Sequence, residues 1–454
     1  MQTLSQVIKA CNDFLWGAPM ILLLVGTHIF LTVRLHFVQR HTIKAVKLSI
    51  TPEGGGEGEV SKFGALATEL AATIGTGNII GISTAIALGG PGAVFWCWLS
   101  GILGMATKYG ESLLAVKYRT RNDKGEYVGG PMYTIERGLG SKWKWLAVLF
   151  AVFMVLATFG TGCTVQSHAI SEILNKTFHL PMTLSGVIVT VLCAVVILGG
   201  VKGISKVCEK LVPFMSLFYM LGCAAILAMN WRFIGEALLL MLQNAFQPKA
   251  LVGGFMGGGL AAACRYGVAR GLFSHESGLG TAPILSASAI SRNPVRQALV
   301  SMTGTFWDTV VVCAVTGLVV VTSMVKHPAS FLGVADDDLT RTAFSFLPGG
   351  QYILAIALAV FAFTTILGWS FYGEKCVEYL FGTKSNLWYR LSFLAVLFVG
   401  TVTSLDLIWN FSDLMNGLMA FPNLVSVLAL SGVIVAETKH YLWQGHLDET
   451  AQDD

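Results

Sequence analysis

Long apolar segments recur along the whole chain and are separated by short polar stretches. Each segment is long enough to cross roughly 30 Å of hydrocarbon as a helix. The pattern predicts an all-α polytopic membrane protein in which residues 1–454 form a single transmembrane domain. Eleven transmembrane helices are expected, at residues 14–36, 63–89, 92–117, 143–167, 182–200, 208–229, 248–271, 296–324, 351–379, 388–406 and 412–436.

The second of these spans is interrupted at its centre by Gly75-Thr76-Gly77-Asn78. Glycine weakens a helix, and irregular backbone at mid-membrane depth is tolerated only where it is buried in protein or lines a polar cavity. An unwound turn frees N–H donors at the start of one half-helix and C=O acceptors at the end of the other, which hold a carboxylate and a cation in secondary transporters. Close helix packing by small residues is the alternative interpretation.

A second glycine-rich stretch, Val252-Gly-Gly-Phe-Met-Gly-Gly-Gly-Leu260, opens the seventh span. Leaving out the helix at 14–36, ten spans remain, and they divide into a first repeat at 63–229 and a second repeat of opposite orientation at 248–436. Each half then begins with a glycine-interrupted helix, as in the inverted five-helix repeats of transporters. Residues 437–454 are expected to form a tail.

The distribution of basic residues predicts the orientation, because Lys and Arg in short loops stay on the cytoplasmic side. If the N-terminus lies outside, 21 of the 30 Lys and Arg residues fall in loops placed inside and 6 in segments placed outside. The N-terminus is therefore expected outside and the tail in the cytoplasm. With 54% hydrophobic and 12% charged residues, the chain is too apolar for an ordinary soluble domain. Its net charge of +4 follows from the loops and does not indicate nucleic acid binding.

Several long motifs resemble those of the alanine or glycine:cation symporters. They are Thr73-Ile-Gly-Thr-Gly-Asn-Ile79, Ala87-Leu-Gly-Gly-Pro-Gly-Ala-Val-Phe-Trp96, Gly104-Met-Ala-Thr-Lys-Tyr109, Gly129-Gly-Pro-Met-Tyr133 and Tyr266-Gly-Val-Ala-Arg-Gly-Leu-Phe-Ser-His-Glu-Ser-Gly-Leu-Gly-Thr-Ala-Pro283. The resemblance covers essentially the whole chain. Most members carry Asn-Glu-Ala where this chain has His275-Glu276-Ser277, a difference expected on the cytoplasmic side and relevant to gating.

The resemblance implies a leucine-transporter-type fold with one extra N-terminal helix, and sodium-driven uptake of small neutral amino acids such as alanine and glycine. It implies that Thr76, Gly77 and Asn78 wrap the charged groups of the amino acid. It also implies a sodium site made of the Ala71 and Ile74 carbonyls with the hydroxyls of Thr364 and Thr365. Oxygen ligands suit sodium, a hard cation, although membrane threonines usually bond to their own helix.

Four further residues are predicted to line the same cavity. Trp369 lies one turn after Thr365 on the same helix face, where an indole would exclude large side chains, or would simply pack. Gln166 could face the cavity or make an interhelical hydrogen bond. Gly257 and Gly258 could form the opposite wall by contributing backbone without bulk.

Two buried carboxylates are candidates for coupling or gating. Asp308 lies near the middle of the eighth span, where it could bind a cation, carry a proton or hold a structural polar contact. Glu69 precedes the first interruption by six residues and is expected to pair with Arg265 or Arg270 at an inner gate, or to be a solvated vestibule residue. Lys108 and Glu111, spaced three apart, are expected to pair with each other.

These observations favour a sodium-coupled symporter in the plasma (inner) membrane of a prokaryote, whose partners are an amino acid, sodium and the lipid bilayer, with no nucleic acid. A proton-coupled carrier of the same fold, with Asp308 or Glu69 titrating, is the nearest alternative. An ion channel is less favoured because no repeated filter is present. An enzyme is disfavoured because the spans contain no nucleophile–base pair or metal cluster. The sequence does not indicate the preferred amino acid or the oligomeric state.

Overall fold

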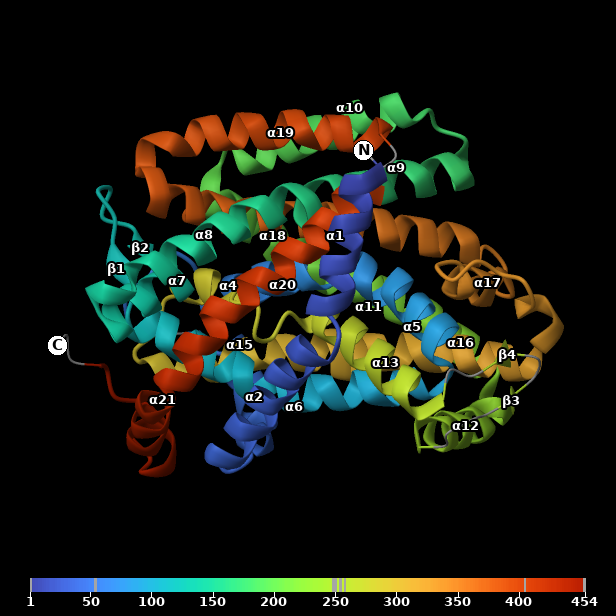
Figure 1. The fold of residues 1–454 in the computed structure, drawn as a ribbon, viewed down its shortest axis with the longest axis horizontal. Coiled ribbons are helices and arrows are strands. Elements are labelled where there is room, and N and C mark those ends of the chain that lie inside the picture. Colours follow the sequence, from blue (N-terminus) through green and yellow to red (C-terminus); the bar gives the residue numbers. More distant parts are fainter. Residues whose placement is uncertain are drawn as a thin grey trace.

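The computed structural model describes residues 2–52, 55–246, 251–252, 255–256, 259–403 and 406–451, and most of them are helical (Figure 1). The helices are α1 Gln2–Leu15, α2 Ala18–Arg34, α3 Thr42–Ile50, α4 Lys62–Thr73, α5 Ile82–Gly89, α6 Gly92–Lys117, α7 Pro131–Tyr133, α8 Lys144–Phe159, α9 Val165–Phe178, α10 Met182–Ile197, α11 Gly200–Met229, α12 Ile234–Phe246, α13 Gly259–His275, α14 Ala282–Ser286, α15 Pro294–Thr305, α16 Ala314–Lys326, α17 Leu339–Ser345, α18 Gly350–Phe381, α19 Asn386–Val402, α20 Asp406–Ala429 and α21 Ser431–Thr438. Two short antiparallel hairpins pair β1 Thr120–Arg121 with β2 Tyr127–Val128 and β3 Leu251–Val252 with β4 Phe255–Met256.

Six helical stretches of the described chain are long and apolar enough to cross a membrane, which identifies a multi-pass membrane protein. They are Gln6–Arg34, Ser141–Phe178, Gly200–Met229, Pro294–Lys326, Gly350–Phe381 and Thr383–Val402. Two bent pairs, Lys62–Thr73 with Gly77–Gly89 and Asn410–Ala429 with Ser431–Trp443, raise the number to eight. The predicted total of eleven therefore stays a prediction.

The outer surface of the bundle is apolar where α10 and α19 lie side by side (Figure 1). Val191 and Val195 on α10 and Val399 on α19 are more than half exposed. Apolar side chains on a membrane-facing surface meet lipid, so they need no protein partner.

Two predicted boundaries at the C-terminal end differ from the structure. The last predicted span, 412–436, crosses a bend of 56° after Ala429. The predicted tail from residue 437 is not loose, because the helix continues as a π-helical turn over Lys439–Trp443. Beyond it, the Ala451 N–H donates to the Arg292 carbonyl at 2.7 Å.

The first helix break lies where the sequence predicts it. Helix α4 ends at Thr73, Ile74 is extended, and the chain resumes as a π-helical turn over Gly77–Gly81 that leads into α5. The two halves meet at 53°. Gly75 cannot be replaced by a larger residue without movement, since a Cβ there would lie 2.6 Å from Thr365 Oγ1.

The predicted second break, in the glycine-rich stretch 252–260, falls in part on residues outside the described ones, and the described chain has a helix break about twenty residues later. Helix α13 runs unbroken from Gly259 to His275 and the chain becomes helical again only at Ala282. Glu276, Gly278 and Gly280 all have positive φ, at 54°, 94° and 84°, a backbone region that ends a right-handed helix.

Helix α2 packs directly against this second break. A Cβ at Gly278 would lie 2.4 Å from Leu24 Cδ2. His28 of α2 lies 2.7 Å from Thr107 Oγ1, and its ring centroid is 5.9 Å from that of His275. The break is therefore covered by protein on its α2 side.

A buried ion pair joins α4 to α6 and corrects two predicted pairings. Lys108 Nζ lies 3.4 Å from Glu69 Oε1, and both side chains are almost completely buried. Glu69 thus pairs with Lys108, not with Arg265 or Arg270. Glu111 is not the ion-pair partner of Lys108, and its Oε1 accepts from Asn423 Nδ2 at 2.8 Å. The burial of Lys108 explains this pairing. An ammonium group between packed helices pairs with the nearest carboxylate, which need not lie on its own helix.

The ion pair predicts a large stability effect with a recognisable signature. Lys108→Met leaves the Glu69 carboxylate buried and unpaired, so we expect it to lower the free energy of unfolding by about 3–5 kcal/mol. Adding Glu69→Gln removes the stranded charge and should restore most of the loss. Melting temperatures in detergent measure both, with Lys142→Met, at an exposed site, as the control. A double variant as unstable as Lys108→Met alone would contradict the pairing.

Close packing of α13 on α6 gives a second prediction. A Cβ at Gly267 would lie 2.3 Å from the Ala93 carbonyl oxygen, whereas a Cβ at Gly26, in α2, meets nothing within 4 Å. We expect Gly267→Val to lower stability by about 1–3 kcal/mol through overpacking, and Gly26→Val to lower it by less. Equal melting temperatures for the two variants would refute this account of the interface.

Candidate functional site

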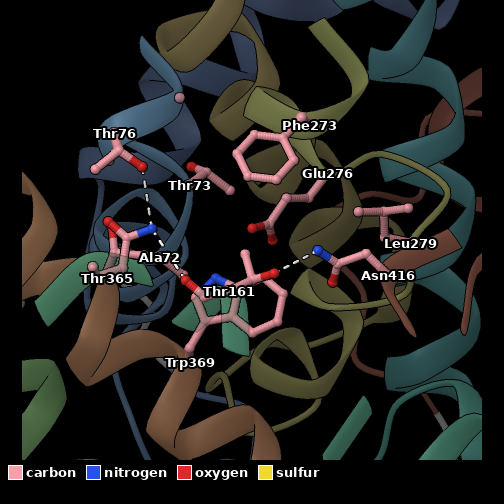
Figure 2. Close-up of a pocket in the computed structure, with 13 residues that line it drawn as sticks. Ala72, Thr73, Thr76, Thr161, Phe273, Glu276, Leu279, Thr365, Trp369 and Asn416 are labelled. Atoms are coloured by element: carbon pink, nitrogen blue, oxygen red, sulfur yellow. Dashed lines mark hydrogen bonds between the residues drawn. The ribbon is translucent and has the colours of Figure 1, made fainter. Parts of the chain in front are cut away.

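A small cavity lies between the two helix breaks (Figure 2). Its volume is about 20 Å³, which leaves room for little more than one water molecule. It is lined by Ala72, Thr73, Gly75, Thr76, Gly77, Thr161, Gln166, Phe273, Glu276, Leu279, Thr365, Trp369 and Asn416. These residues come from both breaks, the turn between α8 and α9, α18 and α20.

The first break contributes backbone to one wall of the cavity. Its Gly75 N–H donates to Asn78 Oδ1 at 2.9 Å, so the side chain of Asn78 closes the turn. Gly77 begins the second half-helix, where backbone N–H groups lack partners within the helix. Together with the helix dipole, such an end favours an anion such as a carboxylate.

The opposite wall carries the acceptors of Asn416 and Glu276, whereas Gln166 lies beside the first break, its Oε1 3.6 Å from the position of a Cβ at Gly75. Gln166 Nε2 donates to Thr76 Oγ1 at 3.3 Å and to the Thr161 carbonyl at 3.1 Å, and Asn416 Nδ2 donates to Thr161 Oγ1 at 2.7 Å. Gln166 Oε1 and Asn416 Oδ1 are buried and make no hydrogen bond within the described residues. The Glu276 carboxylate lies on the same side as Asn416, across the cavity from Thr76 (Figure 2). This wall suits a cation with several N–H groups, such as an ammonium.

Bulky side chains limit the space. Trp369 is 1% exposed, and a Cβ at Gly162 would lie 2.2 Å from its Cβ, so the tryptophan is held closely against the α8–α9 turn. Phe273 and Leu279 complete the apolar part of the lining. The structure thus brings Trp369 and Thr365 to the same cavity, as their spacing predicts.

Several oxygen atoms gather beside the first break where the resemblance implies sodium. Thr365 Oγ1 lies 3.1 Å from the Ala71 carbonyl oxygen and 3.0 Å from that of Phe361. Thr364 Oγ1 donates to the same Phe361 carbonyl at 2.9 Å. Ile74 directly follows α4, in extended conformation. The Phe361 carbonyl was not predicted, although threonines commonly bond to the carbonyl three or four residues earlier.

Asn78 and Asp308 contact each other and do not line the cavity in the described structure. Asp308 Oδ1 accepts from Asn78 Nδ2 at 2.6 Å, and its Oδ2 accepts from Ser274 and Thr309 hydroxyls at 2.9 and 2.7 Å. These are the contacts of a structural polar group, one of the three roles that the sequence left open. Gly257 and Gly258 lie outside the described residues.

Eight lining residues were not among the site residues predicted from the sequence: Ala72, Thr73, Gly75, Thr161, Phe273, Glu276, Leu279 and Asn416. The one usable signal was Glu276, a carboxylate between closely spaced glycines in an otherwise apolar region. The cytoplasmic position expected for residues 275–277 stays a prediction, and Glu276 lines the cavity. Nothing local distinguishes Asn416, because only the packing of α20 brings it there.

Comparisons with known proteins identify the family. The model of the sodium:alanine symporter family matches residues 1–454. Relatives include a Haemophilus influenzae protein described as an uncharacterized transporter, 46% identical over 100% of this chain and 99% of its own length. The sodium/alanine symporter AgcS of Methanococcus maripaludis is 47% identical over 96% of both chains.

Solved structures show the fold. The transporter MhsT, crystallised with L-phenylalanine, superimposes with a TM-score of 0.55 at 12% identity, covering 84% of this chain and 98% of that one. A manganese transporter of Eremococcus coleocola gives a TM-score of 0.50 at 17% identity, over 88% and 85% of the chains. These similarities indicate a leucine-transporter-type fold. Together with the whole-length family match, they show that the chain belongs to the sodium:alanine symporter family, whose members are transporters and not enzymes.

Proposed function

We propose that this protein is a secondary active transporter that couples sodium entry to the uptake of small neutral amino acids, alanine and glycine foremost, by alternating access. The observation that carries the proposal is the small cavity between two helix breaks, with backbone N–H groups at the first break and the acceptors of Asn416 and Glu276 across from them. A zwitterion needs both kinds of wall. The small volume and the packed Trp369 favour a small side chain.

In the proposed binding mode, the substrate carboxylate meets the backbone at Thr76 and Gly77. The ammonium faces Gln166 Oε1, Asn416 Oδ1 and the Glu276 carboxylate. Asn78 acts as a positioning residue that holds the turn through Gly75 and is itself held by Asp308. Gly257 and Gly258 are proposed to form a further wall of the substrate cavity.

Sodium is proposed to bind between the Ala71 and Ile74 carbonyls and the Thr364 and Thr365 hydroxyls, with the Phe361 carbonyl as an added ligand. Because Gly75 lies against Thr365, an ion there would fix the break that receives the substrate carboxylate. Sodium binding would then favour substrate binding, and substrate binding would favour sodium binding, which is the thermodynamic basis of coupling.

The proposed topology is eleven spans in two inverted five-helix repeats, with α2 as the extra helix, the N-terminus outside and the C-terminus in the cytoplasm. It is supported by one broken helix in each half, α4–α5 and α13–α14, and by the basic loops. A prokaryotic inner membrane is the proposed location. Proton coupling is the alternative, but Asp308 accepts three side-chain hydrogen bonds and Glu69 has an ion-pair partner, which favours structural roles for both.

Uptake of radiolabelled alanine into proteoliposomes tests the function. We expect accumulation with an inward sodium gradient and none with potassium at the same membrane potential and pH. Counterflow by unlabelled alanine would distinguish a carrier from a channel. Accumulation driven by a pH gradient without sodium would overturn the proposed coupling and move it to Asp308 or Glu69.

Thr365→Ala tests the sodium site. Losing one hydroxyl ligand to a cation costs about 1.5–3 kcal/mol, so the sodium concentration for half-maximal uptake should rise about 10-fold or more. Thr322→Ala, on α16, is the matched control because that hydroxyl also bonds to its own helix, at 3.1 Å from the Val319 carbonyl. Unchanged sodium affinity in Thr365→Ala would place the ion elsewhere.

Trp369→Ala tests the size limit. Removing the indole enlarges the cavity, so leucine should compete with alanine uptake about 10-fold more strongly than in the natural protein, about 1.4 kcal/mol of added binding. Trp388→Ala, at a residue 76% exposed, should leave the substrate range unchanged. An unaltered range in Trp369→Ala would exclude this residue as the limit.

Glu276→Gln tests the ammonium contact. A charge-assisted hydrogen bond contributes about 1.5–3 kcal/mol, so the alanine KM should rise by about 10-fold or more while sodium affinity measured without substrate stays near normal. Glu172→Gln, in an exposed ion pair with Lys176, is the control. A normal alanine KM in Glu276→Gln would remove this residue from the proposed binding mode.

A further inference from the structure

A short helix directly follows the end of the span that contains α2. Helix α2 ends at Arg34, and after a 3₁₀ turn over Val38–His41 the chain forms α3, Thr42–Ile50. Because Gln6–Arg34 is long and apolar enough to cross a membrane, α3 begins close to where this span reaches the membrane surface.

One side of α3 is packed against the protein. Ala45 and Ser49, four residues apart, are buried, and α3 contacts both α15 and α4. Leu35 and Val38, just before α3, belong to the same buried apolar cluster as Ala45. The helix is therefore a fixed part of the transporter, and its exposed side has a fixed orientation.

The exposed side of α3 combines isoleucines with lysines. Ile43 is 75% exposed and Ile50 69%, and Lys44 and Lys47 are also exposed. Ile43, Lys47 and Ile50 follow one another at spacings of four and three residues, which places them in one row along the helix. Phe37, 61% exposed, lies in the turn before it. Large apolar side chains beside lysines are typical of a helix at the level of lipid headgroups.

The positive charge of this surface is not balanced by nearby carboxylates. Residues 14–52 contain no Asp or Glu. In the described part of the chain, Lys44 and Lys47 form no ion pair. Arg34 lies over the Phe30 ring, with 5.3 Å between the guanidinium carbon and the ring centre. Clusters of about four or more Lys and Arg beside a membrane span are typical of segments that bind anionic lipid.

The histidine at the start of α3 lies in the same positive field. Burial, followed by the charges of Arg40 and Lys44, lowers the pKa of His41 below its ordinary value. His41 therefore adds little charge near pH 7, and its Nε2 accepts from Arg40 Nε at 3.2 Å. The charge of the surface comes from Arg34, Arg40, Lys44 and Lys47, which suits an anionic partner.

We propose that the exposed basic and apolar side chains of α3 and of the turn before it bind anionic phospholipid at the bilayer surface. The lysines and arginines meet the headgroup phosphates, while the isoleucines and Phe37 enter the upper part of the acyl chains. A soluble anion would use the charges but leave the isoleucines in water, so a lipid is the ligand that fits both. In the proposed topology this lipid lies in the cytoplasmic leaflet.

A lipid at this surface is bound beside helices of the proposed transport site. Helix α3 contacts α4, which ends at the first break, and α15, which continues into the turn that carries Asp308. A lipid that holds α3 at the membrane surface therefore supports both helices, and we expect it to stabilise the folded protein.

Native mass spectrometry of the purified full-length protein, titrated with phosphatidylglycerol or phosphatidylcholine in neutral detergent, tests the proposal. The natural protein should bind phosphatidylglycerol about 10-fold or more tightly than phosphatidylcholine. Each Lys near anionic lipid contributes about 5-fold, or about 1 kcal/mol, so Lys44→Gln/Lys47→Gln should lose about 10-fold or more of the phosphatidylglycerol affinity. Lys142→Gln/Lys384→Gln removes the same charge at exposed residues outside this surface and should bind normally.

Two further variants separate the charged and apolar contributions. Lys44→Arg/Lys47→Arg keeps the charge and should bind phosphatidylglycerol as the natural protein does. Ile43→Ser/Ile50→Ser should weaken binding of both lipids and keep the preference for phosphatidylglycerol. In nanodiscs, phosphatidylglycerol should raise the melting temperature relative to phosphatidylcholine, and Lys44→Gln/Lys47→Gln should lose that increase. All four substituted side chains are exposed, so each variant should melt as the natural protein does in phosphatidylcholine.

Three results would overturn the proposal: no preference for phosphatidylglycerol, the same phosphatidylglycerol affinity in Lys44→Gln/Lys47→Gln, or an equal loss in Lys142→Gln/Lys384→Gln. A dimer that Ile43→Ser/Ile50→Ser dissociates, with phosphatidylglycerol binding unchanged, would also overturn it and show that a second copy of the chain covers this surface. None of these measurements depends on transport, so failure of the sodium or alanine assignment leaves this test intact.

Discussion

The structure depends on one constraint: backbone that leaves the helix inside a membrane still has to be hydrogen-bonded. In each break, an asparagine side chain meets this need and also contacts a buried carboxylate. Asn78 accepts from the Gly75 N–H and donates to Asp308. Asn423 donates to the Gly278 carbonyl at 2.9 Å and to Glu111 at 2.8 Å. The carboxylates orient the amides, and the amides hold the turns that shape the cavity.

Hydrogen bonding of the helix breaks by buried amides and carboxylates also explains why so many charged residues are buried near the cavity. A carboxylate in this environment is stable only when donors surround it, and the donors come from different helices. Glu69 receives Lys108 from α6 and the Ser301 hydroxyl from α15 at 2.8 Å, so one carboxylate joins three helices. These groups join the helices that carry the breaks into one unit.

The sequence predicted those features whose cause is local. Gly75 and Gly77 mark the first break because glycine there weakens the helix at the position itself, and the apolar segments identify the membrane helices. The break at 276–280 was not predicted, because the glycines at 253–259, some of which lie outside the described residues, gave the more obvious signal, whereas Glu276, Gly278 and Gly280 adopt positive φ together. Glycine-rich helices survive in a membrane when they pack tightly, and Gly267 and Gly271 of α13 do so against α6.

The site was predicted in part, for a related reason. Trp369 and Thr365 share a helix face, so their spacing already places them together, and Gln166 is a polar side chain in an apolar span. Asn416 and Thr161 reach the cavity only through the packing of α20 on the turn between α8 and α9. Lys108 shows the limit most clearly: its neighbour in sequence, Glu111, is not its partner in space. Which of two nearby carboxylates receives a buried ammonium is decided by helix packing, which one sequence does not reveal.

The contact between α2 and the second break has an evolutionary consequence. Leu24 and His28 cover Gly278 and His275, so α2 is part of the wall around the irregular backbone that follows α13. A chain without residues 1–34 would still contain the helices on both sides of each break, yet it would lose the cover that α2 gives to the second break. Shortened homologues lacking this helix should therefore be eliminated by selection unless another chain takes its place.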